Sequence, residues 1–104
     1  MLDLRYIREN REAVKENTLL RNVDADVDRV VELYDRRNDS IQRIEELRKR
    51  RNQNAAAMKQ KPSPEERERL IAEGKELKQR LPKLEEELEE LESELRAEAS
   101  RIPN

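Results

Sequence analysis

The sequence predicts an all-α protein in which a short helix precedes a long antiparallel two-helix coiled-coil hairpin. Three observations predict this class. Charged residues make up 46% of the chain, aromatic residues only 2%, and there is a single glycine. A composition rich in Glu, Lys, Arg, Leu and Ala is typical of long helices. A leucine repeat provides a packing face, and a proline-containing segment before it marks a turn between two helices.

The leucine repeat occupies the C-terminal third of the chain. Its members are Leu70, Leu77, Leu81, Leu84, Leu88, Leu91 and Leu95. With Gly74 included, the steps alternate between four and three residues, which is the 3.5-residue period of a coiled-coil seam. Because such a seam is apolar, it needs a partner helix.

A short amphipathic helix is predicted over residues 4–17. Asp3 is a suitable N-cap, since its carboxylate can accept from the first unpaired amides of a helix. The apolar side would consist of Leu4, Ile7, Ala13 and Val14. Residues 18–26 are rich in Asn and Asp and are interpreted as a connection, with Asp26 placed to cap the next helix.

The partner for the leucine repeat is predicted over residues 27–60, which contain neither Gly nor Pro. Its expected seam contains Val27, Val30, Tyr34, Arg37, Ile41, Ile44, Arg48, Arg51, Ala55 and Met58. Val31 and Leu47 are expected on the flank of this seam. The seam is apolar in its first half and becomes small or basic in its second half.

A turn is predicted at residues 61–64, because Pro62 cannot continue a helix and Pro64 follows closely. Ser63 as N-cap, Pro64 as first helical residue and Glu66 three residues after the cap form a capping-box pattern. A third helix is therefore expected over residues 65–101. A short turn between two long helices implies that they are antiparallel.

Folding the chain at this turn pairs positions whose numbers sum to about 125, such as Ile44 with Leu81. In this register Gly74 would leave room for the stem of Arg51. Pro82 lies inside the leucine repeat and lacks the amide hydrogen that a helix interior uses. We expect a kink near residues 78–82 but no helix end, because the repeat keeps its phase across the proline.

Several classes of function are excluded by composition. The chain has no Cys and no His, so disulfides, thiol chemistry, the usual zinc sites and imidazole catalysis are ruled out. The carboxylates of residues 85–98 are interpreted as a solvated helix face and not as a metal site. No apolar run approaches the ~20 residues that span a bilayer, and no signal peptide is evident. We expect a cytoplasmic protein with no membrane partner and no cofactor of its own.

The charges are sorted along the chain. Residues 41–61 carry seven basic and two acidic side chains, whereas residues 82–104 carry three basic and eight acidic ones. A rigid basic surface suits the phosphate backbone of nucleic acid. The consecutive residues Arg48, Lys49, Arg50 and Arg51 cannot all face the seam, and Lys59, Lys61, Lys75 and Lys78 extend the positive field, with Asn52, Gln53 and Asn54 as further hydrogen-bonding groups. The alternative is a coiled-coil end that arginines merely keep soluble.

Several stretches resemble one protein family in order and spacing. They are MLDLRYIREN at the start, VVELYD from Val30, LRKRRNQ from Leu47, LIAEGKEL from Leu70 and RIPN at the end. Together they are similar to the N-terminal tRNA-binding domain of seryl-tRNA synthetases over essentially the whole chain. The sequence departs from the family pattern at Arg11, where proline is usual, at Pro82 and in the region after Asn17.

The resemblance implies a basic helical hairpin that recognises the long variable arm and elbow of serine tRNA. Carried over by position, the candidate contact residues are Arg43, Arg48, Lys49, Arg50, Arg51, Asn52, Gln53, Lys59, Lys61, Lys75 and Lys78. It implies a parent enzyme that is a homodimeric class II ligase using ATP and Mg²⁺ to attach serine to tRNA. A catalytic domain is not present in residues 1–104, so this chain alone is expected to lack enzyme activity and to be monomeric. A structural or protein-interaction coiled coil, or a free-standing non-catalytic paralogue, remains the alternative.

Overall fold

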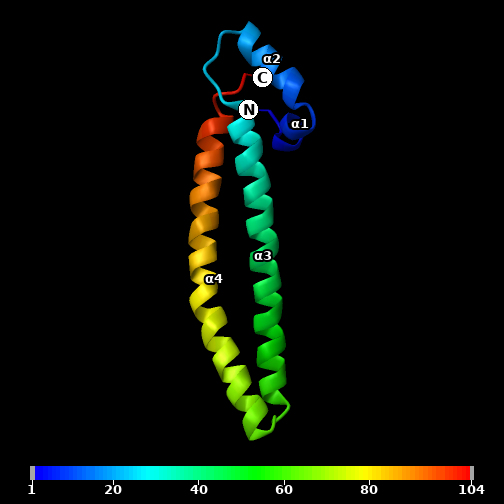
Figure 1. The fold of residues 1–104 in the computed structure, drawn as a ribbon, viewed down its shortest axis with the longest axis vertical. Coiled ribbons are helices and arrows are strands. Elements are labelled where there is room, and N and C mark those ends of the chain that lie inside the picture. Colours follow the sequence, from blue (N-terminus) through cyan, green and yellow to red (C-terminus); the bar gives the residue numbers. More distant parts are fainter. Residues whose placement is uncertain (1, 104) are drawn as a thin grey trace. The chain divides into compact units, whose positions relative to one another are not determined.

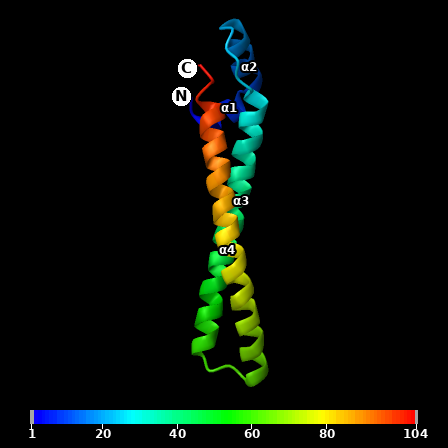
Figure 2. The ribbon, with the colours of Figure 1, turned by 90° about the vertical axis from the view of Figure 1, so that its left-hand side faces the viewer.

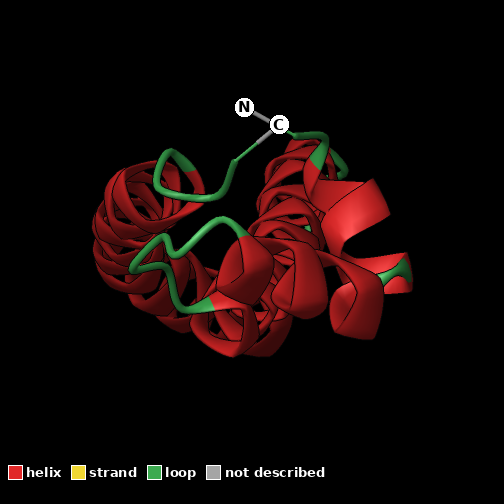
Figure 3. Cartoon of the chain, turned by 90° about the horizontal axis from the view of Figure 1, so that it is seen from above, coloured by secondary structure: helices red, strands yellow, loops and turns green. Residues whose placement is uncertain are grey.

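The computed structural model describes residues 2–103. It contains four helices and, over that range, no strand: α1 (Leu4–Glu9), α2 (Arg11–Leu20), α3 (Val27–Lys59) and α4 (Pro64–Ala99) (Figure 1). Figure 3 shows helices joined only by loops, as the all-α prediction requires. Met1 and Asn104, which belong to the first and last stretches of family resemblance, lie outside the described residues.

The chain divides into two compact units, and each is described by itself. The terminal unit contains the residues up to Asp39 together with those from Glu89 onward. The hairpin unit is Ser40–Leu88. Each unit contains one part of α3 and one part of α4, and these parts run antiparallel, so the predicted helical hairpin is confirmed.

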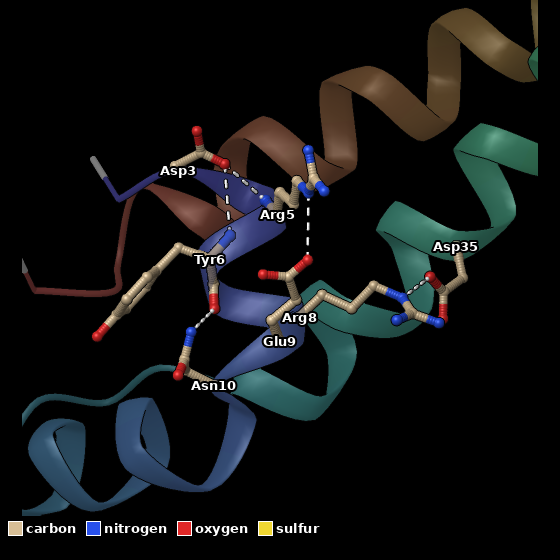
Figure 4. Close-up of polar contacts among 7 residues, drawn as sticks. All are labelled: Asp3, Arg5, Tyr6, Arg8, Glu9, Asn10 and Asp35. Atoms are coloured by element: carbon tan, nitrogen blue, oxygen red, sulfur yellow. Dashed lines mark hydrogen bonds and ion pairs between the residues drawn. The ribbon is translucent and has the colours of Figure 1, made fainter.

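Helix α1 begins as predicted. The Asp3 carboxylate accepts from the backbone amides of Arg5 at 2.8 Å and Tyr6 at 3.4 Å (Figure 4). The helix ends earlier than expected, at Asn10, whose backbone has φ −121° and ψ 37°. Both the backbone N–H and the side-chain amide of Asn10 donate to the Tyr6 carbonyl, at 2.9 and 3.0 Å. The Tyr6 carbonyl accepts both hydrogen bonds, and the non-helical backbone of Asn10 separates α1 from α2.

Helix α2 continues past the predicted end of the first helix. It runs to Leu20, and the chain then turns at Asn22, which has a positive φ of 55°. Asparagine is one of the few residues that adopt this left-handed conformation readily. The predicted cap at Asp26 is confirmed, because its carboxylate accepts from the Arg29 amide at 3.0 Å.

The terminal unit has its own apolar core. It is formed by Ile7, Val14, Val27, Val30, Val31, Leu33, Leu95, Ala99 and Ile102. Both Val30 and Leu33 are almost fully buried, so the α3 segment of this unit is covered on more than its seam face. The burial of Ile7 and Val14 shows that the N-terminal helices supply this extra cover, whereas Ala13 is exposed.

Ion pairs surround this core. Arg8 on α1 pairs with Asp35 on α3 at 2.7 Å (Figure 4), and Arg29 pairs with Glu94 on α4 at 2.8 Å. The same contacts raise the pKa values of both arginines, chiefly through the side-chain hydrogen bonds. Because all four side chains are partly exposed, water screens both pairs and each contributes little to stability.

The hairpin unit has a smaller core. Its buried members are Ile44, Leu47, Leu77 and Leu81, with Leu84 and Leu88 packed against them. Ile44 and Leu81, which the predicted register pairs, both belong to this cluster. Ile71, which lies one residue outside the repeat, is 44% exposed. The leucine repeat is therefore the packing face of α4 in this unit.

The seam on α3 differs from the prediction in its second half. Leu47 is buried, and Arg48, Arg51 and Ala55 are exposed. The seam passes through Ile41, Ile44 and Leu47 in two steps of three residues, where the prediction had a step of three followed by a step of four. The later seam positions therefore lie one residue earlier than predicted. The shift keeps the guanidinium of Arg48 in water, which avoids the penalty of burying a charge.

The loop between α3 and α4 is short, as Figure 2 shows. Lys61 has a positive φ of 51°, which reverses the chain after α3. Ser63 then caps α4: its hydroxyl oxygen accepts from the Glu66 amide at 3.3 Å, and its carbonyl accepts from the Arg67 amide at 2.8 Å. These bonds confirm Ser63 as the N-cap and Pro64 as the first residue of the helix.

Helix α4 runs through Pro82 without ending, as predicted. Proline has no amide hydrogen, so the carbonyl of Lys78, one turn earlier, loses its helical partner. The ring itself is exposed, so the defect is placed on the solvent side and the packing face stays intact. The kink expected at this position stays a prediction.

Candidate nucleic-acid interface

All eleven predicted contact residues lie in the hairpin unit, and every one of their side chains is exposed. We call this set the basic surface; it is Arg43, Arg48, Lys49, Arg50, Arg51, Asn52, Gln53, Lys59, Lys61, Lys75 and Lys78. Nine of them are on α3 or in the loop after it, and two are on α4. The helix that carries the four consecutive basic residues therefore presents most of the positive charge.

One part of the basic surface lines a shallow groove on α3. The groove is formed by Glu45, Arg48, Lys49, Asn52, Gln53 and Ala56. These positions recur every three or four residues, so they share the helix face that points away from Ile44 and Leu47. The groove combines two cations with two amide side chains that can both donate and accept hydrogen bonds.

A second part lies on another side of the same unit. Arg43 and Arg50 line a depression together with Arg80 of α4. Arg80 was missed by the sequence reasoning, because its stretch has balanced charge and no basic run marks it. The pairing of α3 with α4 is what brings this arginine beside the other two.

Few of the cations on the basic surface are neutralised. Arg48 pairs with Glu85 across the helices at 3.1 Å, and Arg50 pairs with Glu46 within α3 at 3.5 Å. Both pairs are about half exposed, so they are screened and exchange easily with water or another anion.

The other cations of the basic surface have no such partner. Within residues 2–103, no carboxylate lies in ion-pair distance of Arg43, Arg51, Lys49, Lys59, Lys61, Lys75 or Lys78. Unpaired exposed cations keep their full field and are available to a polyanion. The hairpin unit therefore offers positive charge on several sides.

The described chain offers little else that could act as a site. No group of three or more acidic side chains converges as cation ligands anywhere in residues 2–103. None of the described helices is both long and apolar enough to cross a membrane. Both tyrosines, Tyr6 and Tyr34, belong to the terminal unit, so the basic surface has no aromatic side chain.

The described residues thus form an α-helical hairpin with an exposed cationic surface. Similarity to known proteins identifies the family of this hairpin. The model of the seryl-tRNA synthetase N-terminal domain matches residues 1–104. The chain belongs to this family.

Curated relatives agree with this assignment. A serine–tRNA ligase of Rubrobacter xylanophilus is 54% identical over 104 residues, and one of Treponema denticola is 47% identical over 104 residues. A serine–tRNA ligase of Treponema pallidum is 41% identical over the same length. Each match covers 100% of this chain but only 24–25% of the relative. The chain therefore spans about a quarter of the length of the proteins it resembles.

Proposed function

We propose that this chain is the tRNA-binding domain of a serine–tRNA ligase and that its basic surface holds the long variable arm and elbow of serine tRNA. The observation that supports this proposal best is the exposure of all eleven side chains of the basic surface on one unit of a domain from this family. Lysine and arginine contacts to phosphates supply affinity that is independent of base sequence.

The chemistry of the basic surface favours recognition by shape. Single-stranded bases are usually held by stacking on aromatic rings, and the hairpin unit has none. A rigid pair of helices with cations at fixed spacing instead suits the regular phosphate positions of a double-helical arm. Selectivity for serine tRNA would then come from the presence and direction of that arm.

The rest of the reaction belongs to the part of the parent enzyme outside these residues. We propose that the parent is a homodimeric class II synthetase that uses ATP and Mg²⁺ to attach serine to tRNA. This domain would contribute binding energy and orientation, so that the acceptor end of the tRNA reaches the catalytic site. By itself the chain would bind tRNA but would not aminoacylate it.

The proposal is tested by measuring the affinity of the 104-residue chain for serine tRNA at 50 and 200 mM salt by fluorescence anisotropy. If about four phosphates are contacted, the dissociation constant should rise roughly a hundredfold over this range. A serine tRNA without its long variable arm should bind at least tenfold more weakly. Equal affinity for the two tRNAs would overturn the assignment of the variable arm as the ligand.

Charge reversal identifies the surface that binds. Lys59→Glu should weaken binding more than Arg50→Glu, because Arg50 is already paired with Glu46 and Lys59 has no such partner within residues 2–103. Lys83→Glu is the matched control, since Lys83 is an exposed lysine of the same unit outside the basic surface. If the control weakened binding as much as Lys59→Glu, the effect would reflect net charge alone.

A structural or protein-interaction coiled coil is the second candidate. The observation that favours it is the exposure of two adjacent leucines at the end of α2, Leu19 at 78% and Leu20 at 79%. This function predicts self-association through apolar contacts, which sedimentation equilibrium would detect. We propose a monomer, since α4 already fills the seam of α3 within the hairpin unit. A concentration-independent monomer mass would remove the dimeric version of the rival.

A further inference from the structure

Besides the exposed Arg48–Glu85 pair, the helices of the hairpin unit are joined by a polar contact inside the seam. Asn54 of α3 is half-buried, and its side-chain amide donates to the backbone carbonyl of Leu70 in α4 at 2.8 Å. That carbonyl also lies one turn before the Gly74 amide, to which it is bonded in a regular helix. A carbonyl oxygen has two lone pairs and can accept both hydrogen bonds.

Gly74 leaves this carbonyl accessible. A helical side chain covers the surface of the turn that precedes it, so a long side chain at position 74 would lie over the Leu70 carbonyl. A Cβ atom built on Gly74 would lie 3.4 Å from the Asn54 Oδ1, which is ordinary contact, whereas a longer side chain would displace the amide. The structure therefore corrects one expectation: the space at Gly74 is used by Asn54, and Arg51 is exposed.

The contact fixes a register that the rest of this segment specifies weakly. None of the side chains from residue 48 to residue 76 is fully buried. Between residues 49–59 and 64–76, no other side-chain hydrogen bond or ion pair joins the two helices. Gly74 is the single glycine of the chain, so sliding α4 along α3 would place Asn54 against a covered backbone.

We propose that Asn54, the Leu70 carbonyl and Gly74 form a register lock, and that Asn54 is a positioning residue for RNA binding. The lock fixes the position of the α3 cations of the basic surface relative to Lys75 and Lys78, which follow Gly74 closely on α4. A buried polar residue at a seam position is known to select one register at some expense of stability. This inference rests on the proposed binding of tRNA by the basic surface.

Two variants remove the lock in different ways. Asn54→Leu removes the donor but leaves an apolar side chain that can fill the seam, so the hairpin should still fold. Gly74→Leu keeps the donor and covers the acceptor. Gly74→Ala is the matched control, because its Cβ is accommodated at 3.4 Å from Asn54. Gln42→Ala is a second control, since it removes an exposed amide from α3 in the same unit.

The register is measured with spin labels at Ala56→Cys and Ile71→Cys, two exposed positions in a chain that has no other cysteine. Affinity for serine tRNA is measured on unlabelled proteins at a temperature where circular dichroism shows equal helix content. Both lock variants should broaden or shift the distance distribution and raise the dissociation constant about threefold to tenfold. Both lock variants should also reduce the salt dependence of the dissociation constant, because fewer phosphates are contacted at the same time. Both controls should behave like the unmodified chain.

The outcomes separate this inference from the proposed function. If the unmodified chain does not bind serine tRNA, the proposed function fails, and the distance distributions still test the lock. If the chain binds and the lock variants keep an unchanged distance distribution, the lock is overturned. If the distribution changes but the affinity and the salt dependence do not, Asn54 has no positioning role in RNA binding.

Discussion

Replacing Leu77 with alanine tests whether the leucine repeat is the face that stabilises the hairpin unit. Leu77 is 3% exposed and belongs to a core with only three other buried side chains. Truncating a buried leucine costs about 2–5 kcal/mol. A two-helix interface is narrow, so it can close around the lost methyl groups better than a deep core. We therefore expect a loss near the lower end, about 2–3 kcal/mol of the free energy of unfolding.

The matched control is Ile71→Ala, which removes a similar side chain six residues earlier on the same helix. Ile71 is 44% exposed, so this change should alter stability by no more than about 0.5 kcal/mol. Urea denaturation followed by circular dichroism at 222 nm gives both free energies. Equal losses for the two variants would refute the assignment of the packing face.

Hydrogen exchange extends the same test to single amides. Regions of a protein open separately when few buried contacts join them. Leu77→Ala should accelerate exchange in the hairpin unit, Ser40–Leu88, because its four buried side chains form a cluster of their own. Amides around the core that contains Ile7 and Leu95 should keep their protection. Uniform acceleration in both units would show that the two cores unfold as one.

Three further changes test local features. Pro82→Ala should raise the free energy of unfolding by about 1–3 kcal/mol, because it restores an amide donor and the exposed ring makes no packing contact that would be lost. Unchanged stability in urea denaturation would contradict this. Ser63→Ala should cost about 1 kcal/mol by removing the cap of α4, again measured in urea, and no loss would show that the 3.3 Å contact is not stabilising. The hydrogen bond to Asp28 raises the pKa of Lys15. The Lys15–Asp28 pair therefore stabilises the fold fully below the unfolded-state lysine pKa of about 10.4. This stabilisation is lost as the pH rises through the folded-state pKa. Melting temperatures from pH 8 to 11.5 should fall less steeply at the alkaline end for Lys15→Gln than for the unmodified chain.

The helix boundaries that carry strong local chemistry could be read from the sequence. Asp3, Asp26 and Ser63 cap helices as predicted, because each has a short oxygen-bearing side chain immediately before a helical stretch. The break at Asn10 was not predicted, since neither Gly nor Pro marks it. At Asn10 the backbone leaves the helical conformation, and the side-chain amide donates to the Tyr6 carbonyl.

The details of the seam depended on packing and could not be read from periodicity alone. A strict repeat placed Arg48 and Ala55 inside, whereas the structure buries Leu47 and half-buries Asn54. A shift of one residue turns a helix face by about 100°, so a small irregularity decides which side chains meet the partner. The exposure of Arg48, Lys49, Arg50 and Arg51 was predictable, because consecutive cations cannot all face a seam. Arg80 was not, because only the pairing of the helices brings it close.

At Arg51 the proposed role in tRNA binding conflicts with the packing of the seam. It lies four residues after Leu47 and three before Asn54, so it shares their helix face, yet its side chain is exposed. Arg51→Leu should bury apolar surface there and raise the free energy of unfolding by about 1 kcal/mol. The same change removes one cation and should weaken binding of serine tRNA about twofold to fivefold at 150 mM salt. Gains in stability at functional positions commonly carry such a loss. Urea denaturation and fluorescence anisotropy on one preparation measure both effects, with Gln42→Leu as the control for added hydrophobicity. If Arg51→Leu raised stability without weakening binding, Arg51 would be a seam residue held out of the core for no gain in affinity.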